Sequence, residues 1–199
     1  MGTEFRILID HDNEKLCQNA ADSAFEEADR LNQIFSDYIA DSEISLLSES
    51  SFTGRNIKLS DELFEVLKYS KSLAIKTDNA FDPTIGQLSR LWRLSRFRKS
   101  LPSKKSIGRA VNLKGIENLQ LIEKSKEAAL KKPGIVLDLG GIAKGYTADM
   151  MLKSLNESGV ERCLIDAGGD LTLGKRPRGE LGWKIEVGGK KHPDLPILS

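Results

Sequence analysis

Apolar residues recur at helical spacing near the N-terminus and predict a long helix from Asn13 to about Ser36. The preceding stretch, TEFRILID, alternates apolar and polar residues, which predicts a half-buried strand. After the helix, Asp41 or Ser42 can cap a short helix that turns Ile44 inward. The segment LSDELFEVLKYSKSLAIKT predicts a second long helix, because its apolar positions repeat in the same way.

The second half of the chain mixes helical and strand patterns. Pro83 fits the first turn of a helix whose apolar face continues to Trp92, and a short helix is expected over residues 104–111. IENLQLI and EAALKK predict a two-strand meander, and GIVLDL predicts the most buried strand. A helix is expected over residues 142–158, followed by strands in RCLIDAG, DLTLGK and WKIEVG. Helices and strands without strict alternation favour a layered α/β or mixed α+β fold.

The composition indicates the class of protein but does not identify its function. The chain has 199 residues, 39% hydrophobic and 30% charged, as in soluble globular proteins. Its 30 Lys and Arg against 29 Asp and Glu give no bulk argument for nucleic acid or an anionic membrane. No apolar run approaches a membrane span, and the charges in MGTEFRILID do not fit a signal peptide. Cys17 and Cys163 are each expected to be buried free thiols, and His11 and His192 are isolated.

The segment LDLGGIAKGYTAD, residues 137–149, has the pattern of a strand that turns into a helix through glycines. Backbone N–H groups and the dipole at such a helix start attract anions, and Lys144 could add a point charge. The spacing differs from the P-loop, in which the lysine follows the second glycine, and from GxGxxG of dinucleotide-binding folds. An anion cradle and a tight turn that only permits close packing both remain open.

Three other features have ordinary structural interpretations when each is considered alone. DAGGD at residues 166–170 fits a turn or bulge between strands. Asp82 and Thr84 in AFDPTIG fit the capping of a helix start. Tyr38 fits a half-buried core aromatic.

Together these segments resemble the ApbE family of flavin transferases, or FAD:protein FMN transferases. The resemblance covers nearly the whole chain and rests on segments in the family's order: MGTEFRI, FSDYIADSEISLL, AFDPTIGQLSRLW, LDLGGIAKGYTAD, and LIDAGGDLTLGKRP followed by WKIEV. It implies an ApbE-like layered sheet-and-helix fold that binds FAD. It also implies transfer of FMN from FAD onto a threonine of an acceptor flavoprotein, with Mg²⁺ and release of AMP.

The resemblance also implies particular site residues. Positions that match FAD contacts in the family are Met1, Tyr38, Ala80, Phe81, Asp82, Asp138 and Lys144, with Thr84 beside them. Gly141 matches a magnesium ligand and could serve only through its backbone carbonyl. Asp149 is a weaker candidate. No residue is assigned as the general base.

The resemblance leads us to expect that residues 1–199 form the N-terminal portion of a single transferase domain. Family members continue beyond WKIEV into a Thr-Ser-Gly strand, an Asp-Pro segment and an acidic cluster that supplies magnesium ligands. An FAD-binding module or a fragment without transferase activity is therefore an alternative function. The family implies the periplasmic side of the bacterial cell envelope and a lipoprotein signal, but as written the chain is expected to be soluble. The expected partner is a flavoprotein, not a nucleic acid.

Overall fold

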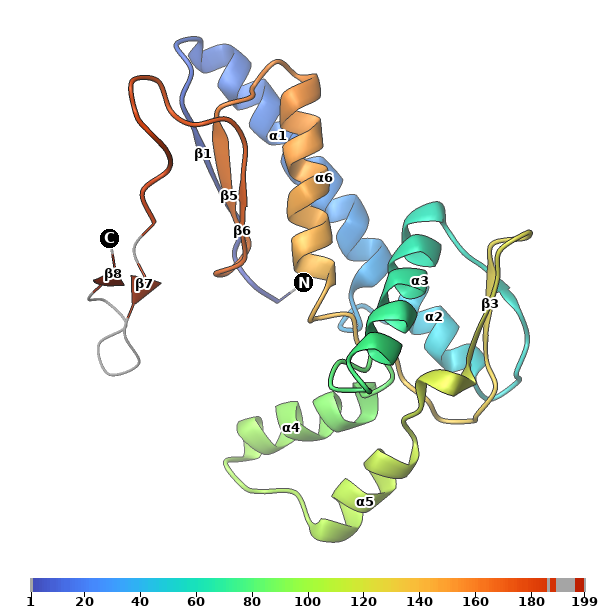
Figure 1. Ribbon diagram of the computed structural model, residues 1–199. Helices are drawn as coiled ribbons and strands as arrows, with labels where there is room; N and C mark the ends of the chain where they lie inside the picture. The colour runs from blue at the N-terminus through green and yellow to red at the C-terminus, as the bar shows by residue number, and fades with distance from the viewer. Residues whose placement is uncertain (1, 186, 189–195, 199) are drawn as a thin grey trace. The chain divides into compact units, whose positions relative to one another are not determined.

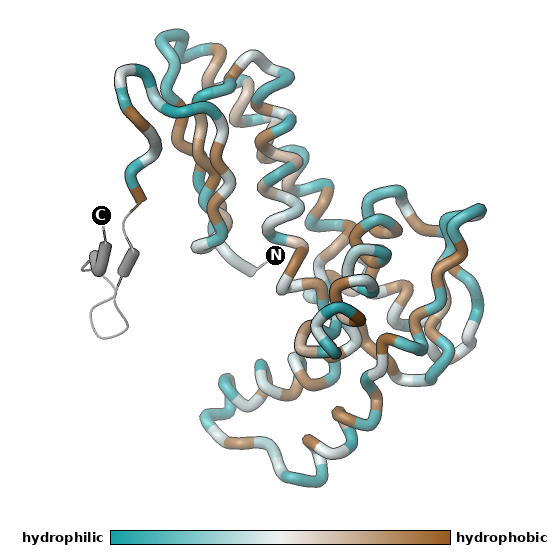
Figure 2. The backbone as a smooth tube through the Cα atoms, in the orientation of Figure 1, coloured by the Kyte–Doolittle hydropathy of each residue, from teal (hydrophilic) through white to brown (hydrophobic). Residues whose placement is uncertain are grey.

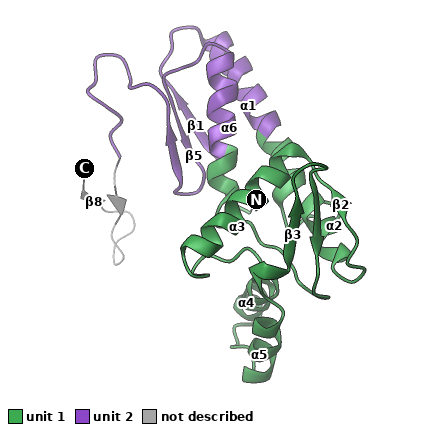
Figure 3. Cartoon of the chain, turned by 45° about the vertical axis from the view of Figure 1, so that its right-hand side comes forward, with its two compact units in different colours: residues 1–2, 28–147 green, residues 3–27, 148–199 purple. Residues whose placement is uncertain are grey.

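The computed structural model describes residues 2–185, 187–188 and 196–198 (Figure 1). The chain divides into two compact units, shown in different colours in Figure 3. Unit 1 consists of Met1–Gly2 and Ala28–Thr147, and unit 2 of Thr3–Glu27 and Ala148–Ser199. The helices α1 (Glu14–Phe35) and α6 (Ala143–Glu157) each contribute turns to both units.

Unit 1 contains most of the helices and one small antiparallel sheet. Its strands lie in the order β2-β4-β3, and β3 and β4 form the meander expected from the sequence. Besides its part of α1 and α6, its elements are α2 (Glu43–Ser50), β2 (Ile57–Lys58), α3 (Asp61–Lys76), α4 (Gly86–Arg98), α5 (Lys104–Asn112), a 3-10 turn (Ile116–Asn118), β3 (Leu119–Ile122) and β4 (Glu127–Leu130).

Serine caps set the starts of two helices in unit 1. The hydroxyl of Ser42 accepts a hydrogen bond from the Ser45 amide at 3.3 Å, and Ser60 does the same for the Leu63 amide at 3.2 Å. The carboxylate of Glu43 accepts hydrogen bonds from the amide and hydroxyl of Ser60 at 2.5 and 2.7 Å, which links the two caps. Fully buried leucine and isoleucine side chains form the core of unit 1, among them Ile44 and Leu47 of α2, Leu63 and Leu67 of α3, Leu130 of β4, and Leu137.

Unit 2 is built around an antiparallel sheet in the order β1-β5-β6, with β1 at Arg6–Ile9, β5 at Cys163–Asp166 and β6 at Leu171–Leu173. The register places Ile7 opposite Ile165. Figures 1 and 3 both show the unit 2 turns of α1 and α6 on one face of this sheet. Apolar stretches coincide with the strands, whereas the loop from β1 to α1 is hydrophilic (Figure 2). A further antiparallel pair joins β7 (Val187–Gly188) and β8 (Pro196–Leu198).

The DAGGD segment is the turn between β5 and β6. Gly168 and Gly169 have φ values of 66° and 96°, a backbone region that favours glycine. The Gly169 amide donates to the Asp166 carboxylate at 2.7 Å. A Cβ on Gly168 would lie 2.0 Å from Oγ1 of Thr3, so this turn also depends on glycine for space. The interpretation of the segment as a turn is confirmed.

A cluster of Arg178 with two aspartates closes one end of unit 2. The Arg178 guanidinium donates to the carboxylates of Asp10 and Asp12, and the Arg178 amide donates to Oδ2 of Asp10 at 2.6 Å. The hydrogen bond from the Arg178 amide is the main reason that the pKa of Asp10 lies below its ordinary value. The hydrogen bonds from the Arg178 side chain lower the pKa of Asp12. They fix the segment after β6 to the end of β1.

Three local expectations were wrong, and a fourth was confirmed only in part. GIVLDL does not form a strand of a sheet: it makes one isolated parallel bridge, between Val136 and Ile85. Helix α4 begins at Gly86 rather than Pro83, which lies in the turn before it. The Trp92 side of α4 is not buried, since Trp92 is 46% exposed. The strand expected in WKIEVG covers only Val187–Gly188 among the described residues, and residue 186 lies outside them.

No helix within the described part of the chain is long and apolar enough to traverse a bilayer.

Candidate functional site

Two segments that lie far apart in the sequence run side by side in unit 1. The Asp138 amide donates to the carbonyl of Pro83 at 2.8 Å, and the Gly86 amide donates to the carbonyl of Val136 at 2.9 Å. A Cβ on Gly86 would lie 2.6 Å from both Cγ1 and the carbonyl oxygen of Val136, so only glycine fits this approach. The AFDPTIG and LDLGG segments are therefore joined through their backbones.

Asp82 and Thr84 form a buried hydrogen-bonded turn within the first segment. Oδ1 of Asp82 accepts from the amide of Thr84 at 2.9 Å and from its hydroxyl at 2.6 Å. The Thr84 oxygen in turn accepts from the Gly115 amide at 2.7 Å, and Nζ of Lys114 lies 3.8 Å from Oδ2 of Asp82. Asp82 does not cap α4, since Ile85 is at the N-cap position. The two side chains instead shape the loop that carries Phe81.

Phe81 and Ala80 follow a tight turn at the end of α3. The turn uses left-handed backbone at Asp78 and Asn79, with φ values of 50° and 61°. Ala80 is exposed, and the half-buried Phe81 ring comes close to the glycine pair: a Cβ on Gly141 would lie 3.3 Å from Cε2 of Phe81. This places the Phe81 ring against the turn before α6.

Asp138 lies at the junction of the two segments, and its carboxylate has two partners. Oδ1 accepts from the Gly140 amide at 2.8 Å, and Oδ2 accepts from Nη2 of Arg93 at 3.2 Å. Arg93 also donates two hydrogen bonds to the carboxylate of Asp37, at 2.5 and 3.2 Å. Burial alone would lower the pKa of Arg93, but the hydrogen bonds to Asp37 and the charges of Asp37 and Asp138 outweigh it and raise the pKa.

Tyr38 is exposed rather than half-buried, with 63% of its surface accessible. The Arg93 guanidinium carbon lies 4.1 Å from the centroid of the ring, within the range of a cation–π contact. Gly2 is also close, since a Cβ there would lie 3.5 Å from Cε2 of Tyr38. Met1 lies outside the described residues. Arg93 thus connects two predicted FAD contacts, Tyr38 and Asp138.

A pocket of about 550 Å³ opens beside the side chains that Arg93 contacts. Tyr38, Arg93 and Asp37 line it, whereas Asp82 and Asp138 do not. The pocket combines two exposed aromatic side chains, Tyr38 and Phe52, with cationic side chains. Its remaining lining residues are Ala40, Ser45, Ser48, Glu49, Gln87, Arg90 and Val136.

The last predicted residues lie at the start of α6 and along it. Lys144 is in the first turn of α6 and is half-buried, and Gly140 and Gly141 are exposed in the turn before it. Asp149 belongs to unit 2, where its carboxylate accepts a hydrogen bond from the Thr172 hydroxyl at 3.2 Å. Lys144 and the glycine pair are thus the predicted residues found at the helix start.

The described residues do not by themselves fit a magnesium site. Mg²⁺ requires an octahedron of oxygen ligands, usually with at least one carboxylate. No group of three or more His, Cys, Asp or Glu side chains in the described part of the chain could hold a metal ion. Asp138, the acid next to the glycine pair, already accepts hydrogen bonds on both oxygens. Gly141 could therefore contribute only one carbonyl ligand to a site completed by other groups.

Sequence reasoning did not find Arg93 and Asp37. Arg93 lies in a segment that reads as an ordinary amphipathic helix, and its partners are 56 and 45 residues away in the chain. Asp37 directly precedes Tyr38 within the matched segment FSDYIADSEISLL, and this adjacency was the one available signal.

The fold is that of solved flavin transferases of the ApbE type. The ApbE protein from Thermotoga maritima superposes with a TM-score of 0.85 at 28% identity, over 98% of this chain and 62% of that one. Flavin transferase ApbE from Vibrio cholerae gives a TM-score of 0.79 at 26% identity, over 94% of this chain and 61% of that one.

The sequence pattern of the ApbE family matches residues 1–197, and the chain belongs to the ApbE family. Among curated relatives, an FAD:protein FMN transferase from Klebsiella pneumoniae (strain 342) is 35% identical over 120 residues, which is 60% of this chain and 38% of the relative. The FAD:protein FMN transferase of Escherichia coli (strain K12) is 27% identical over 191 residues, 94% of this chain and 54% of the relative. The chain thus spans about half the length of the curated relatives it matches.

Proposed function

We propose that this chain is the N-terminal portion of an FAD:protein FMN transferase, with residues 1–199 belonging to one transferase domain. The reaction would move the FMN moiety of FAD onto a threonine of an acceptor flavoprotein and release AMP. The observation that carries the proposal is the direct backbone pairing of AFDPTIG with LDLGG, which gathers Phe81, Asp138 and the start of α6. Family membership and the names of the relatives support the same reaction. We place it at the bacterial cell envelope, as the family resemblance implies.

The side chains around this junction supply chemistry that FAD requires. The exposed ring of Tyr38 provides a flat surface for an aromatic ring system, while Arg93 holds its orientation. The amides at the start of α6 and the cation of Lys144 suit the two phosphates of FAD. Asp138 is an acceptor held in place by two donors, which suits recognition of a hydroxyl or ring N–H. We propose Met1, Ala80, Phe81, Asp82 and Thr84 as the remaining residues of this site.

Magnesium enters the proposal only as a partner of the FAD phosphates. When bound, it would neutralise charge that develops on the phosphate during transfer. Gly141 would contribute its carbonyl oxygen, and carboxylates from outside the described residues would be needed to complete the ligand set.

The test is flavin transfer onto a protein. The chain, in its present length and extended to the length of its relatives, is incubated with FAD, Mg²⁺ and an acceptor flavoprotein, and covalent flavin fluorescence is read on a denaturing gel. Labelled acceptor from the extended chain supports the proposal. Tight FAD binding by both chains without any labelled acceptor would refute it in favour of an FAD-binding module. If neither chain binds FAD, the site assignment is wrong.

Asp138→Asn tests the site itself. The amide keeps an acceptor for the Gly140 N–H but removes the charge that faces Arg93. We expect FAD binding to weaken at least tenfold, equivalent to about 1.4 kcal/mol. Fluorescence titration with FAD measures the change, and circular dichroism checks that the variant is folded. Unchanged affinity would reduce the glycine segment to a structural turn.

A further inference from the structure

The near-neutral charge of the chain conceals a strong segregation. Residues 86–115, which include α4 and α5, hold nine of the 30 Lys and Arg residues and none of the 29 Asp and Glu residues. The rest of the chain therefore carries eight more acidic than basic residues. Such a concentration of one sign creates a local positive field that the net charge of +1 does not reveal.

The α4–α5 hairpin, defined here as residues 86–113, is also the least buried helical part of unit 1. Among its helical residues only Gly86 in α4 and Ala110 in α5 are buried, whereas α3 buries six residues. Large apolar side chains are exposed along it, namely Trp92 at 46%, Leu94 at 42%, Phe97 at 85%, Leu101 at 85% and Val111 at 41%. The hairpin therefore combines unpaired apolar surface with positive charge.

The tip of the hairpin is a built turn rather than a loose loop. Lys99 ends α4 in a left-handed conformation with φ of 50°, and the Ser100 amide donates to the Ser95 carbonyl at 3.1 Å. Ser103 then caps α5, accepting from the Ser106 amide at 3.1 Å. This turn holds Leu101 next to the last turns of α4.

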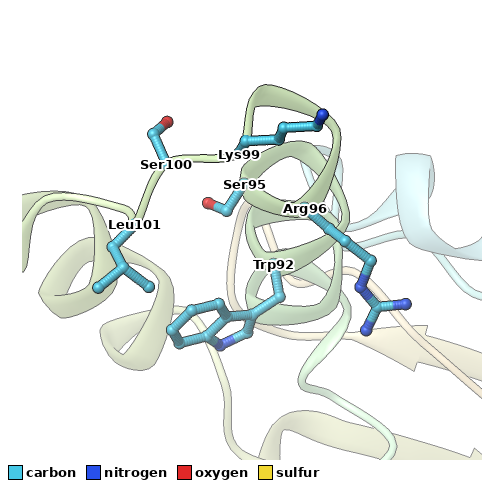
Figure 4. Close-up of a pocket in the computed structure, with 6 residues that line it drawn as sticks. All are labelled: Trp92, Ser95, Arg96, Lys99, Ser100 and Leu101. Carbon is cyan, nitrogen blue, oxygen red and sulfur yellow. The ribbon is translucent and has the colours of Figure 1, made fainter.

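A pocket of about 340 Å³ lies between the last turns of α4 and the tip. Its apolar lining is Trp92 and Leu101, its hydroxyls are Ser95 and Ser100, and its cations are Arg96 and Lys99. Figure 4 shows Trp92 and Ser95 reaching from α4 toward Leu101 on the loop. A pocket lined by apolar, hydroxyl and cationic residues suits a phosphate attached to a hydrophobic group.

Most cations of the hairpin lack a carboxylate partner among the described residues. Arg93 pairs with Asp37 and Asp138, and Lys114, just beyond the hairpin, lies near Asp82. The seven others form no ion pair with a described residue: Arg90, Arg96, Arg98, Lys99, Lys104, Lys105 and Arg109. Their charge is directed to solvent and would attract a polyanionic surface.

We propose that the α4–α5 hairpin docks on an anionic phospholipid bilayer, with Phe97, Leu101 and Trp92 entering the interface and the surrounding cations contacting lipid phosphates. Helices that lie in a membrane interface combine exposed aromatic and aliphatic residues with Lys and Arg in this way. A protein partner fits less well, because the core of a protein interface is depleted in charged residues, whereas the hairpin carries eight cations and no acidic residue. Nucleic acid fits less well, because three of the five exposed apolar side chains, Leu94, Leu101 and Val111, are aliphatic and offer no ring on which a base could stack. The docking is independent of the proposed flavin transfer.

Vesicle sedimentation of the full chain tests the docking. Equal mixtures of phosphatidylglycerol and phosphatidylcholine are compared with pure phosphatidylcholine. We expect sedimentation only with the anionic vesicles, and release by high salt. In Trp183→Phe, which leaves Trp92 as the single tryptophan, fluorescence should shift to shorter wavelength on binding. Binding equally to neutral vesicles, or to neither kind, would overturn the proposal.

Matched variants localise the binding to the hairpin. Lys104→Glu with Lys105→Glu should weaken vesicle binding at least tenfold, since each basic residue near an anionic surface contributes about fivefold. Lys124→Glu with Lys131→Glu makes the same change in net charge at exposed positions elsewhere in unit 1 and should have little effect. Equal losses in both pairs would show a general charge effect and refute docking through the hairpin. Binding to single-stranded oligonucleotides in place of vesicles would refute it in favour of nucleic acid.

Discussion

Gly86→Ala probes the close backbone approach that joins the two halves of the candidate site. The added Cβ would lie 2.6 Å from both Cγ1 and the carbonyl oxygen of Val136, and 2.8 Å from its carbonyl carbon. Two of these three neighbours are backbone atoms, so a change of side-chain rotamer cannot relieve the overlap. The segment has to move away, so the hydrogen bond from Gly86 to Val136 is lost, and part of the strain remains in the native state.

The expected change in the free energy of unfolding follows from opposing contributions. Overpacking costs about 1–3 kcal/mol, and losing the hydrogen bond costs about 1 kcal/mol. Alanine gains up to about 1 kcal/mol over glycine in a helix. The net effect is a loss of about 2 kcal/mol in the free energy of unfolding, or about 4–8 °C in Tm for a chain of this size.

Gly108→Ala in α5 is the matched control, because a Cβ there meets no atom within 4 Å. This variant should gain about 0.5–1 kcal/mol from helix propensity alone. Urea denaturation followed by circular dichroism compares both variants with the unmodified chain. If Gly86→Ala proves as stable as Gly108→Ala, the close approach at Val136 is not a constraint and the inferred junction of the two segments is wrong.

Three further results are expected from other parts of the molecule. Arg93→Met should lower the free energy of unfolding by about 1–2 kcal/mol in urea denaturation, because it leaves the nearly buried carboxylate of Asp37 unpaired, and Arg93→Lys should recover part of the loss. Burial raises the pKa of Cys163 to about 11, so alkylation at neutral pH should label it only after unfolding, and rapid labelling of the native chain, read by mass spectrometry, would contradict its burial. Arg178 lowers the pKa of Asp10, so the stabilisation by the Asp10 carboxylate is present above the ordinary carboxyl pKa and is lost as pH falls through the lowered value. In thermal unfolding, Arg178→Gln should therefore lose less stability on acidification than the unmodified chain. Parallel pH profiles of the two proteins would exclude this role.

Local signals predicted the elements that local physics controls. Ser42 capped the expected short helix, and the helix over residues 142–158 appeared as α6, because caps and apolar periodicity act within a few residues. GIVLDL was predicted as a buried strand, yet its backbone hydrogen bonds go to partners outside any sheet. The Leu137 amide donates to the hydroxyl of Ser48, 89 residues away, and the Asp138 amide donates to a turn carbonyl. Burial was therefore predictable, but the partners were not.

In the candidate site, too, some residues could be predicted from local sequence signals and others could not. The motif residues Phe81, Asp138 and Gly141 could be selected from the sequence, and the structure brings them together. Arg93 could not be selected, because its role arises only when α4 lies beside both Asp37 and Asp138. A charged side chain on an exposed helix has no sequence signature that separates a solvated cation from one that links two segments.

The discontinuity of unit 2 has a consequence for the order in which the chain folds during synthesis. Strand β1 is made first, but its partner β5 follows only after the whole of residues 28–147 has been synthesised. At roughly 5–20 residues per second, Ile7 waits about 8–30 seconds for Ile165. Throughout that interval the edge of β1 is unpaired, and by the end of it unit 1 already has all of its residues available. A chaperone that shields β1, or slow translation before β5, would therefore change the yield of unit 2 far more than that of unit 1.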